Sequence, residues 1–401
     1  MSTSETPARS PRVTAVLRED ERVTPLELFF DLVFVLAITQ CTALMASNPT
    51  WQGLGRGVLV LGLLWWAWVG YAWLTSVVDP EEGAVRIAIF AAMAALLVAA
   101  LCVPTTFDAG DSATIFAIAY GIVRVGQIAL IGLAGRDDPN LTHSVRTLAG
   151  STAVGVTIVV AGSFASDPAV RLAIWAGALL LDMAGPYFFG VEGWKLVPGH
   201  FAERHGLIVL IALGESIVAI GVGAEHGIDV GVIGAAVLGT VLAAAIWWQY
   251  FDVVAIVAAR RLAKATPGRP QNAMARDSYS YLHFPMIVGI VLVALGMKKT
   301  LAHVEDPLKL VPGFALLGGV ALYLLAHVAF RYRQIHTINT RRLGLAIVLL
   351  ALVPAAVELP ALATLGILAA LLVALIVYET RSYGESRNRI RHDLAIEPNP
   401  D

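Results

Sequence analysis

The sequence predicts an all-α, polytopic integral membrane protein. Of its 401 residues, 57% are hydrophobic and only 14% are charged, whereas soluble domains carry about a quarter of charged residues. Long apolar runs recur along the chain, among them residues 57–78, 87–103 and 343–357. These runs are too many and too long for one soluble core, so they are expected to cross a membrane.

At about 20 residues per span, the apolar runs predict twelve transmembrane helices. The expected spans are 25–46, 54–76, 84–104, 112–134, 145–163, 169–189, 203–224, 230–256, 278–297, 311–330, 342–357 and 359–380. A re-entrant pair is the alternative for the last two, because only a short proline-containing stretch separates them. The first 22 residues are polar and lack an apolar stretch before a small-residue cleavage site, which favours an uncleaved first helix over a signal peptide.

The distribution of basic residues predicts the orientation. With a cytoplasmic N-terminus, most of the 28 Lys and Arg fall in cytoplasmic segments, as the positive-inside rule requires. Both termini are therefore expected in the cytoplasm. The longest loop, residues 258–277, is basic. The tails, residues 1–22 and 382–401, are polar and are predicted to be disordered.

The second half of the chain aligns weakly with the first. The aligned positions are Glu27 with Glu203, Trp65–Trp66 with Trp247–Trp248, and Arg146 with Arg341. Their offsets grow in order, from 176 to 182 to 195 residues, as loop insertions would produce. The alignment predicts two six-helix repeats, residues 23–190 and 198–381. Because each repeat has an even number of spans, the repeats would be parallel, an arrangement in which transporters place a site between the halves.

Ionisable residues inside the spans are candidates for function. The first helix begins with a capping-box pattern, Thr24 to Glu27, and capping at the cytoplasmic interface explains Glu27. Asp31 has no such role, since it lies about 9 Å into the helix on the same face as Glu27. It therefore needs a buried cation or a proton; an interhelical hydrogen bond that fixes packing is the alternative.

Glu215 is the leading functional candidate, because it lies close to the middle of its span. Its neighbours Gly214 and Ser216 are expected to allow a close helix approach. Arg124, also in mid-helix, is predicted to be the counter-ion of Glu215 or Asp31. A buried structural salt bridge is the alternative for Arg124.

Together, the candidate residues form two groups. The candidate transport or ion site comprises Asp31, Glu215, Arg124, Asp182 and Asp252. The cytoplasmic-entrance cluster comprises Glu27, His200, Glu203, Arg204 and His205. His200 and Glu203 have the spacing of two metal ligands but lack a third. A solvated charge cluster is therefore favoured there, and no metal or cofactor site is predicted.

Two stretches carry a family resemblance. VTPLELFFDLVFVLAITQ, from Val23, and HFAERHGLIVLIALGESIVAIG, from His200, resemble hallmark segments of the bacterial low temperature requirement A (LtrA) family. The resemblance extends over nearly the whole chain. It implies a multi-pass protein of the bacterial cytoplasmic (inner) membrane, with no defined biochemical activity.

The first helix is also distantly similar to the Phe-Ser-Asp signature of a potassium channel family with two six-helix repeats. The corresponding residues here are Phe29-Phe30-Asp31. Phe30 stands where that family has Ser, and the second repeat reads Arg204–Leu207 instead of the motif. These departures count against a potassium pore.

The leading hypothesis is a secondary transporter or channel-like protein, with the bilayer and an unidentified small solute or ion as partners. The alternative is a non-transporting membrane protein, either a sensor or an enzyme acting on a lipid. No nucleotide-binding or catalytic fingerprint points to an enzyme, and no basic stripe points to nucleic acid. A cavity between the halves lined by Glu215 and Arg124 would favour transport, whereas a dry, closed bundle would favour the alternative.

Overall fold

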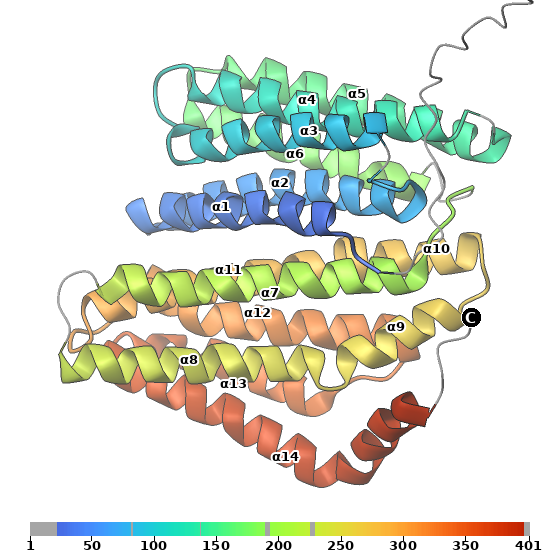
Figure 1. Cartoon of the computed structure of the whole chain (residues 1–401). Coiled ribbons are helices and arrows are strands. Elements are labelled where there is room, and N and C mark those ends of the chain that lie inside the picture. The colour runs from blue at the N-terminus through green and yellow to red at the C-terminus, as the bar shows by residue number, and fades with distance from the viewer. Residues whose placement is uncertain (1–21, 82, 137, 189–192, 225–228, 397–401) are drawn as a thin grey trace, which may run out of the picture.

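The computed structural model describes residues 22–81, 83–136, 138–188, 193–224 and 229–396, and helices account for nearly all of them. Figure 1 shows the helices as a stack whose members run side by side. In this view α3 to α6 form the upper layer, α1 and α2 lie below them, and the helices of the second half fill the lower part.

The elements follow one another along the chain in two groups. The first group is α1 (Pro25–Ser47), α2 (Trp51–Val77), α3 (Gly83–Cys102), the 3-10 turn η1 (Val103–Thr105), α4 (Ser112–Ala134), α5 (Pro139–Ser163) and α6 (Pro168–Phe188). The second group is α7 (Pro198–Gly223), α8 (Val230–Phe251), α9 (Val254–Lys264), α10 (Arg269–Ala275), the π-helix η3 (Arg276–Tyr281), α11 (His283–Ala302), α12 (Leu310–Ile335), α13 (Thr340–Ala356) and α14 (Ala361–Ile396).

The prediction of an all-α chain with many membrane spans is confirmed. Within the described ranges, eleven helical segments are long and apolar enough to cross a membrane. The predicted twelfth is α13, which has only 17 residues and contains Pro354. The predicted and observed numbers of spans therefore differ by this one short helix.

The basic segment expected as a loop at residues 258–277 is largely helical, so that expectation was wrong. It contains most of α9, all of α10 and the start of η3, with a break at Gly268, whose φ is 92°. Along α9, Ala258 and Leu262 are buried four residues apart. The apolar face of α9 packs against α7, and its basic residues lie on the other face. The prediction of a loop rested on the charge of this segment and took no account of its amphipathic period.

The C-terminal tail also differs from expectation. Residues 382–396 continue α14 as a helix, although they were predicted to be disordered. This segment contains no proline and mixes acidic with basic residues, a composition that a solvated helix tolerates. Residues 397–401 and the predicted N-terminal tail up to residue 21 lie outside the described residues.

The predicted cap of the first helix is confirmed. The Glu27 amide donates to the Thr24 hydroxyl at 3.4 Å, and the Glu27 carboxylate accepts from the Thr24 amide at 2.9 Å. A second cap precedes α5, where the Asp138 carboxylate accepts from the Leu141 amide at 3.3 Å and pairs with Lys195 at 3.2 Å. The Leu141 amide, followed by Lys195, lowers the pKa of Asp138. This cap is therefore held by an ionised carboxylate.

Two glycines allow a close approach between α11 and α12 in the second half. A Cβ added at Gly319 of α12 would lie 2.7 Å from the backbone oxygen of Gly289 in α11, and the reverse addition would give the same distance. Backbone atoms cannot move aside as side-chain ends can, so only glycine fits at either position. Gly214, which was expected to make such a contact, has no neighbour within 4 Å of its would-be Cβ.

This contact yields a stability prediction. The substitution Gly319→Ala should destabilise the protein by about 1–3 kcal/mol, because the added methyl group forces two backbones apart. Thermal unfolding of the purified protein in detergent, followed by fluorescence, measures the change. Gly150→Ala is the matched control, since its would-be Cβ meets nothing within 4 Å and alanine is the better helix former. An equal melting temperature for Gly319→Ala and wild type would contradict the contact.

Candidate functional site

A buried charge cluster, defined by Glu27, Asp31, His200 and Arg204, joins α1 to α7. Arg204 lies 2.6 Å from Asp31 and 3.1 Å from Glu27, and His200 lies 2.8 Å from Glu27. None of the four side chains is more than 1% exposed. Asp31 therefore has its cation, which is Arg204 and not Arg124 as expected from the sequence.

Helix α2 completes the surroundings of this charge cluster. The Trp68 indole donates to Asp31 at 2.8 Å, and Arg204 donates to the Thr75 hydroxyl at 2.9 Å. The Arg204 guanidinium also lies 5.5 Å from the centre of the Trp68 ring, a cation–π distance. These bonds offset the desolvation of four ionisable groups, a requirement for any buried ion pair.

Most of the predicted cytoplasmic-entrance cluster is buried rather than solvated. Only Glu203 is exposed, where it accepts from the backbone amide of Val23 at 3.2 Å. His205 is fully buried, and its ring lies 5.0 Å from that of Trp68 and 5.3 Å from that of His283. No group of three metal-ligating side chains was found within the described part of the chain.

Glu215 lies at the opposite end of the α1–α7 contact. Its carboxylate is 2.5 Å from the Thr39 hydroxyl of α1, and the Thr42 hydroxyl is a second partner. No described lysine, arginine or histidine forms an ion pair with Glu215; Lys298 acts on it only through a longer-range charge interaction. The predicted pairing of Glu215 with Arg124 is therefore wrong.

The two threonines limit which hydrogen bonds the Glu215 carboxylate can form. The Thr39 hydroxyl also lies 3.0 Å from the backbone oxygen of Val35, and that of Thr42 lies 3.1 Å from that of Ile38. A hydroxyl has one hydrogen to donate. When that hydrogen goes to the backbone, Glu215 bonds to the hydroxyl oxygen only if the carboxyl itself carries a proton. This geometry accommodates a protonated Glu215.

Arg124 forms a separate buried pair with Asp182, between α4 and α6. The two side chains lie 2.8 Å apart, and Arg124 also donates to Thr152 at 3.0 Å and to Gln127 at 2.6 Å. This arrangement matches the structural salt bridge that was the alternative interpretation. Gly70 of α2 makes room for it, since a Cβ there would lie 2.7 Å from Arg124.

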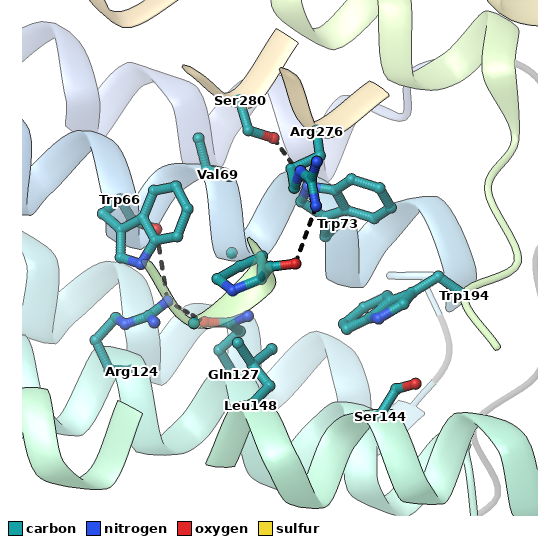
Figure 2. Close-up of a pocket in the computed structure, with 13 residues that line it drawn as sticks. Trp66, Val69, Trp73, Arg124, Gln127, Ser144, Leu148, Trp194, Arg276 and Ser280 are labelled. Atoms are coloured by element: carbon teal, nitrogen blue, oxygen red, sulfur yellow. Dashed lines mark hydrogen bonds between the residues drawn. The ribbon is translucent and has the colours of Figure 1, made fainter. Parts of the chain in front are cut away.

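The pocket shown in Figure 2, called here the first pocket, lies between the two halves of the chain. It contains about 620 Å³ of empty space, part of it open to the outside, and is lined by α2, α4, α5, α6 and η3. Arg124 and Trp66 line one side, and Arg276 and Ser280 of η3 line the other. Glu215 is not among its lining residues. The first pocket is therefore not the cavity lined by both Glu215 and Arg124 that would favour transport, because only Arg124 of the two lines it.

Asp252, the last candidate, lies at a break between α8 and α9. It lines a second pocket, together with a buried pair that the sequence did not reveal, Arg342 and Glu379 at 2.9 Å. Both residues were assigned to the ends of spans, where charges are common. The alignment of Arg146 with Arg341 had pointed to the start of α13, where Arg342 is the next residue.

The fold and these intramembrane charges define a multi-pass membrane protein of bacterial type. The chain belongs to the family described as bacterial low temperature requirement A protein (LtrA), whose model matches residues 22–377. It is similar to the uncharacterized protein RA0937 of Rhizobium meliloti (strain 1021), with 31% identity over 319 residues that cover 74% of each chain. No solved structure matches it.

The charge cluster gives a second stability prediction. Arg204→Met should destabilise the protein by about 3–5 kcal/mol, because it leaves two buried carboxylates without their cation. The double variant Arg204→Met with Asp31→Asn should recover part of that loss, since one uncompensated charge is removed with its partner. Thermal unfolding in detergent measures both, with the exposed neighbour substitution Glu203→Gln as control. A double variant no more stable than Arg204→Met would argue against the pair.

Proposed function

We propose that the protein is a secondary transporter of the bacterial inner membrane, in which Glu215 binds and releases a proton. The observation that carries the proposal is the contact between Glu215 and Thr39. A carboxylate in a membrane-spanning helix is unfavourable unless it is paired or serves a function. Glu215 has hydroxyl partners rather than a cation, so a proton is the simplest way to neutralise it.

The other intramembrane charges have structural partners. Asp31 pairs with Arg204, and Asp182 pairs with Arg124. Such pairs hold helices in register and are costly to break. The proposal therefore favours Glu215 over Asp31 and Asp182 as the group that binds a proton. The charge cluster would keep the α1–α7 contact together at the opposite end.

The position of Glu215 supports the two-repeat arrangement. Thr39 and Glu215 are separated by 176 residues, the same offset that aligns Glu27 with Glu203. They are thus equivalent positions of the two repeats, and they touch. Residues contact their own equivalents only close to a two-fold axis. The axis would run between α1 and α7, the first helices of the repeats.

The helix neighbours support the same arrangement. In the first half α1 packs against α3, α3 against α4, α4 against α5, and α2 against α6. Counting α9, α10 and η3 as an insertion, the matching pairs of the second half also pack: α7 with α11, α11 with α12, α12 with α13, and α8 with α14. Parallel repeats that rock about a shared axis are a common basis of alternating access.

Proton movement into proteoliposomes tests the proposal. Purified protein is reconstituted with a pH-sensitive dye inside, and a panel of sugars, polyols, amino acids and organic acids is added outside at a fixed membrane potential. We expect at least one solute to drive proton movement. Glu215→Gln should reduce that movement at least tenfold, because the amide cannot bind and release a proton.

The control for this experiment is Glu203→Gln, which removes an exposed carboxylate from the same helix and should leave the flux unchanged. Equal proton movement by wild type and Glu215→Gln would remove Glu215 from the mechanism. A wild-type protein that moves no proton with any solute of the panel would favour the alternative class, a sensor or lipid-modifying enzyme.

The orientation is a separate prediction. The distribution of basic residues predicts that both termini lie in the cytoplasm, by the positive-inside rule. A green fluorescent protein fused after residue 401 should therefore fluoresce in a bacterial host, and alkaline phosphatase fused there should be inactive. The opposite pair of results would invert the proposed topology.

A further inference from the structure

The second pocket lies within the second half of the chain, between α8, α9, α12, α13 and α14. It contains about 1130 Å³ of empty space, part of it open to the outside. Buried polar residues line it, including Gln249, His327, Gln334 and Arg342. Aromatic side chains, Trp248 and Phe330, line it as well.

Five buried side-chain amide and imidazole atoms around this pocket have no hydrogen-bond partner in the described protein. They are both side-chain polar atoms of Gln249, both of Gln334, and Nε2 of His327. The three side chains are at least 94% buried by exposed fraction, at 2%, 6% and 2% respectively. Buried polar atoms are nearly always hydrogen-bonded in folded proteins. Five exceptions around one pocket indicate that a bound molecule supplies the missing partners.

The chemistry of the five atoms is mixed. Arg342 lies 2.8 Å from Nδ1 of His327. A guanidinium can only donate, so Nδ1 accepts and Nε2 carries the ring hydrogen as a donor. Gln249 and Gln334 each offer both a donor and an acceptor. A hydroxyl group also both donates and accepts. Adjacent hydroxyl groups of one ligand would therefore complement the donor and the acceptor of each amide.

The formal charges around the pocket cancel. Arg342 makes two bonds to Glu379, at 3.0 and 2.9 Å. Asp252 and Arg331 are the other charged lining residues, one of each sign. A neutral ligand therefore leaves no uncompensated charge, whereas a singly charged ligand would.

The backbone is interrupted at the same place. Helix α8 ends at Phe251 and α9 begins at Val254, with Val253 at φ −139° and ψ −34° outside the helical region. Transporters often build solute sites where a membrane helix is broken, because the break frees backbone groups for the solute.

The first pocket provides an internal comparison. It is lined by α2, α4, α5 and α6, and the second by α8, α12, α13 and α14, the helices in matching positions. Trp66 and Trp248, which align in sequence, line one pocket each. In the first pocket, however, Gln127 already accepts from Arg124 at 2.6 Å. The described side-chain atoms without a partner there are Nε1 of Trp66 and Nε of Arg124, whereas in the second pocket both glutamine amides and an imidazole nitrogen lack partners.

We infer that the second pocket binds a neutral, hydroxyl-rich solute such as a polyol or a monosaccharide. Gln249, Gln334 and His327 hydrogen-bond its hydroxyl groups, and Trp248 or Phe330 contacts its apolar C–H face. That this bound solute is also the transported one rests on the proposed function; the binding itself does not.

Isothermal titration calorimetry of the full-length protein in detergent tests the inference. The probes are myo-inositol, D-mannitol and D-glucose, with D-gluconate and D-glucosamine as charged counterparts. At least one neutral probe should bind saturably, and the charged counterparts should bind at least tenfold more weakly. Gln249→Leu and Gln334→Leu should each weaken the neutral probe about tenfold or more, as expected when hydrogen bonds to a ligand are lost.

The same variants distinguish a binding role from a structural one. Because both glutamines lack partners in the protein, the leucine variants should unfold at the wild-type temperature or above it. The matched control is Gln271→Leu, a buried glutamine that donates to the backbone oxygen of Leu262 at 3.0 Å. It should lower the unfolding temperature and leave the affinity unchanged. Val257→Trp, which narrows the pocket from α9, should abolish binding without touching the polar groups.

Several results would overturn the inference. They are an absence of saturable binding by all three neutral probes, binding of charged probes only, or unchanged affinity in both glutamine variants and in Val257→Trp. Because calorimetry requires no transport, these results leave the Glu215 proposal standing. Conversely, polyol binding without proton movement in proteoliposomes would reject the proposed function and keep the site.

Discussion

The packing of the two halves depends on one buried interaction, the contact of Arg204 with Glu27 and Asp31. Arg204 comes from α7 and its partners from α1, and Trp68 and Thr75 of α2 complete the set. A guanidinium placed in an apolar bundle without these oxygens would be strongly unfavourable. The pairing therefore determines which face of α7 meets α1 and in which register.

This register has a consequence at the other end of the same helices. With Arg204 held against Asp31, α1 and α7 run parallel and bring Glu215 against Thr39. Thr39 lies eight residues beyond Asp31 along α1, or about 12 Å at 1.5 Å per residue. The two ends differ in chemistry. In the charge cluster, cations pair directly with carboxylates, whereas Glu215 has hydroxyl groups that can each donate only one hydrogen. The charge cluster is suited to hold helices together, and Glu215 is suited to gain and lose a proton.

The two pockets show a related contrast. Both are lined by helices in matching positions of the two halves, and each adjoins a buried pair of arginine with a carboxylate, Arg124 with Asp182 and Arg342 with Glu379. In the first pocket Gln127 accepts from Arg124, which also pairs with Asp182. In the second, Gln249, Gln334 and His327 keep atoms without partners. The second pocket thus has more polar atoms without a partner than the first.

The sequence by itself determined the helical class, most of the spans and the cap at Thr24. The reason is local: an apolar stretch in a bilayer must satisfy its own backbone hydrogen bonds, and only a helix does so within one segment. It also indicated that Asp31 needs a cation or a proton, since burial follows from position along one helix. The sequence did not predict the ion-pair partners. Arg124 was expected as the counter-ion where the structure has Arg204, and the pair of Arg342 with Glu379 was not predicted. Only the tertiary structure decided these pairs, because Asp31 and Arg204 are 173 residues apart and their contact depends on which helices become neighbours.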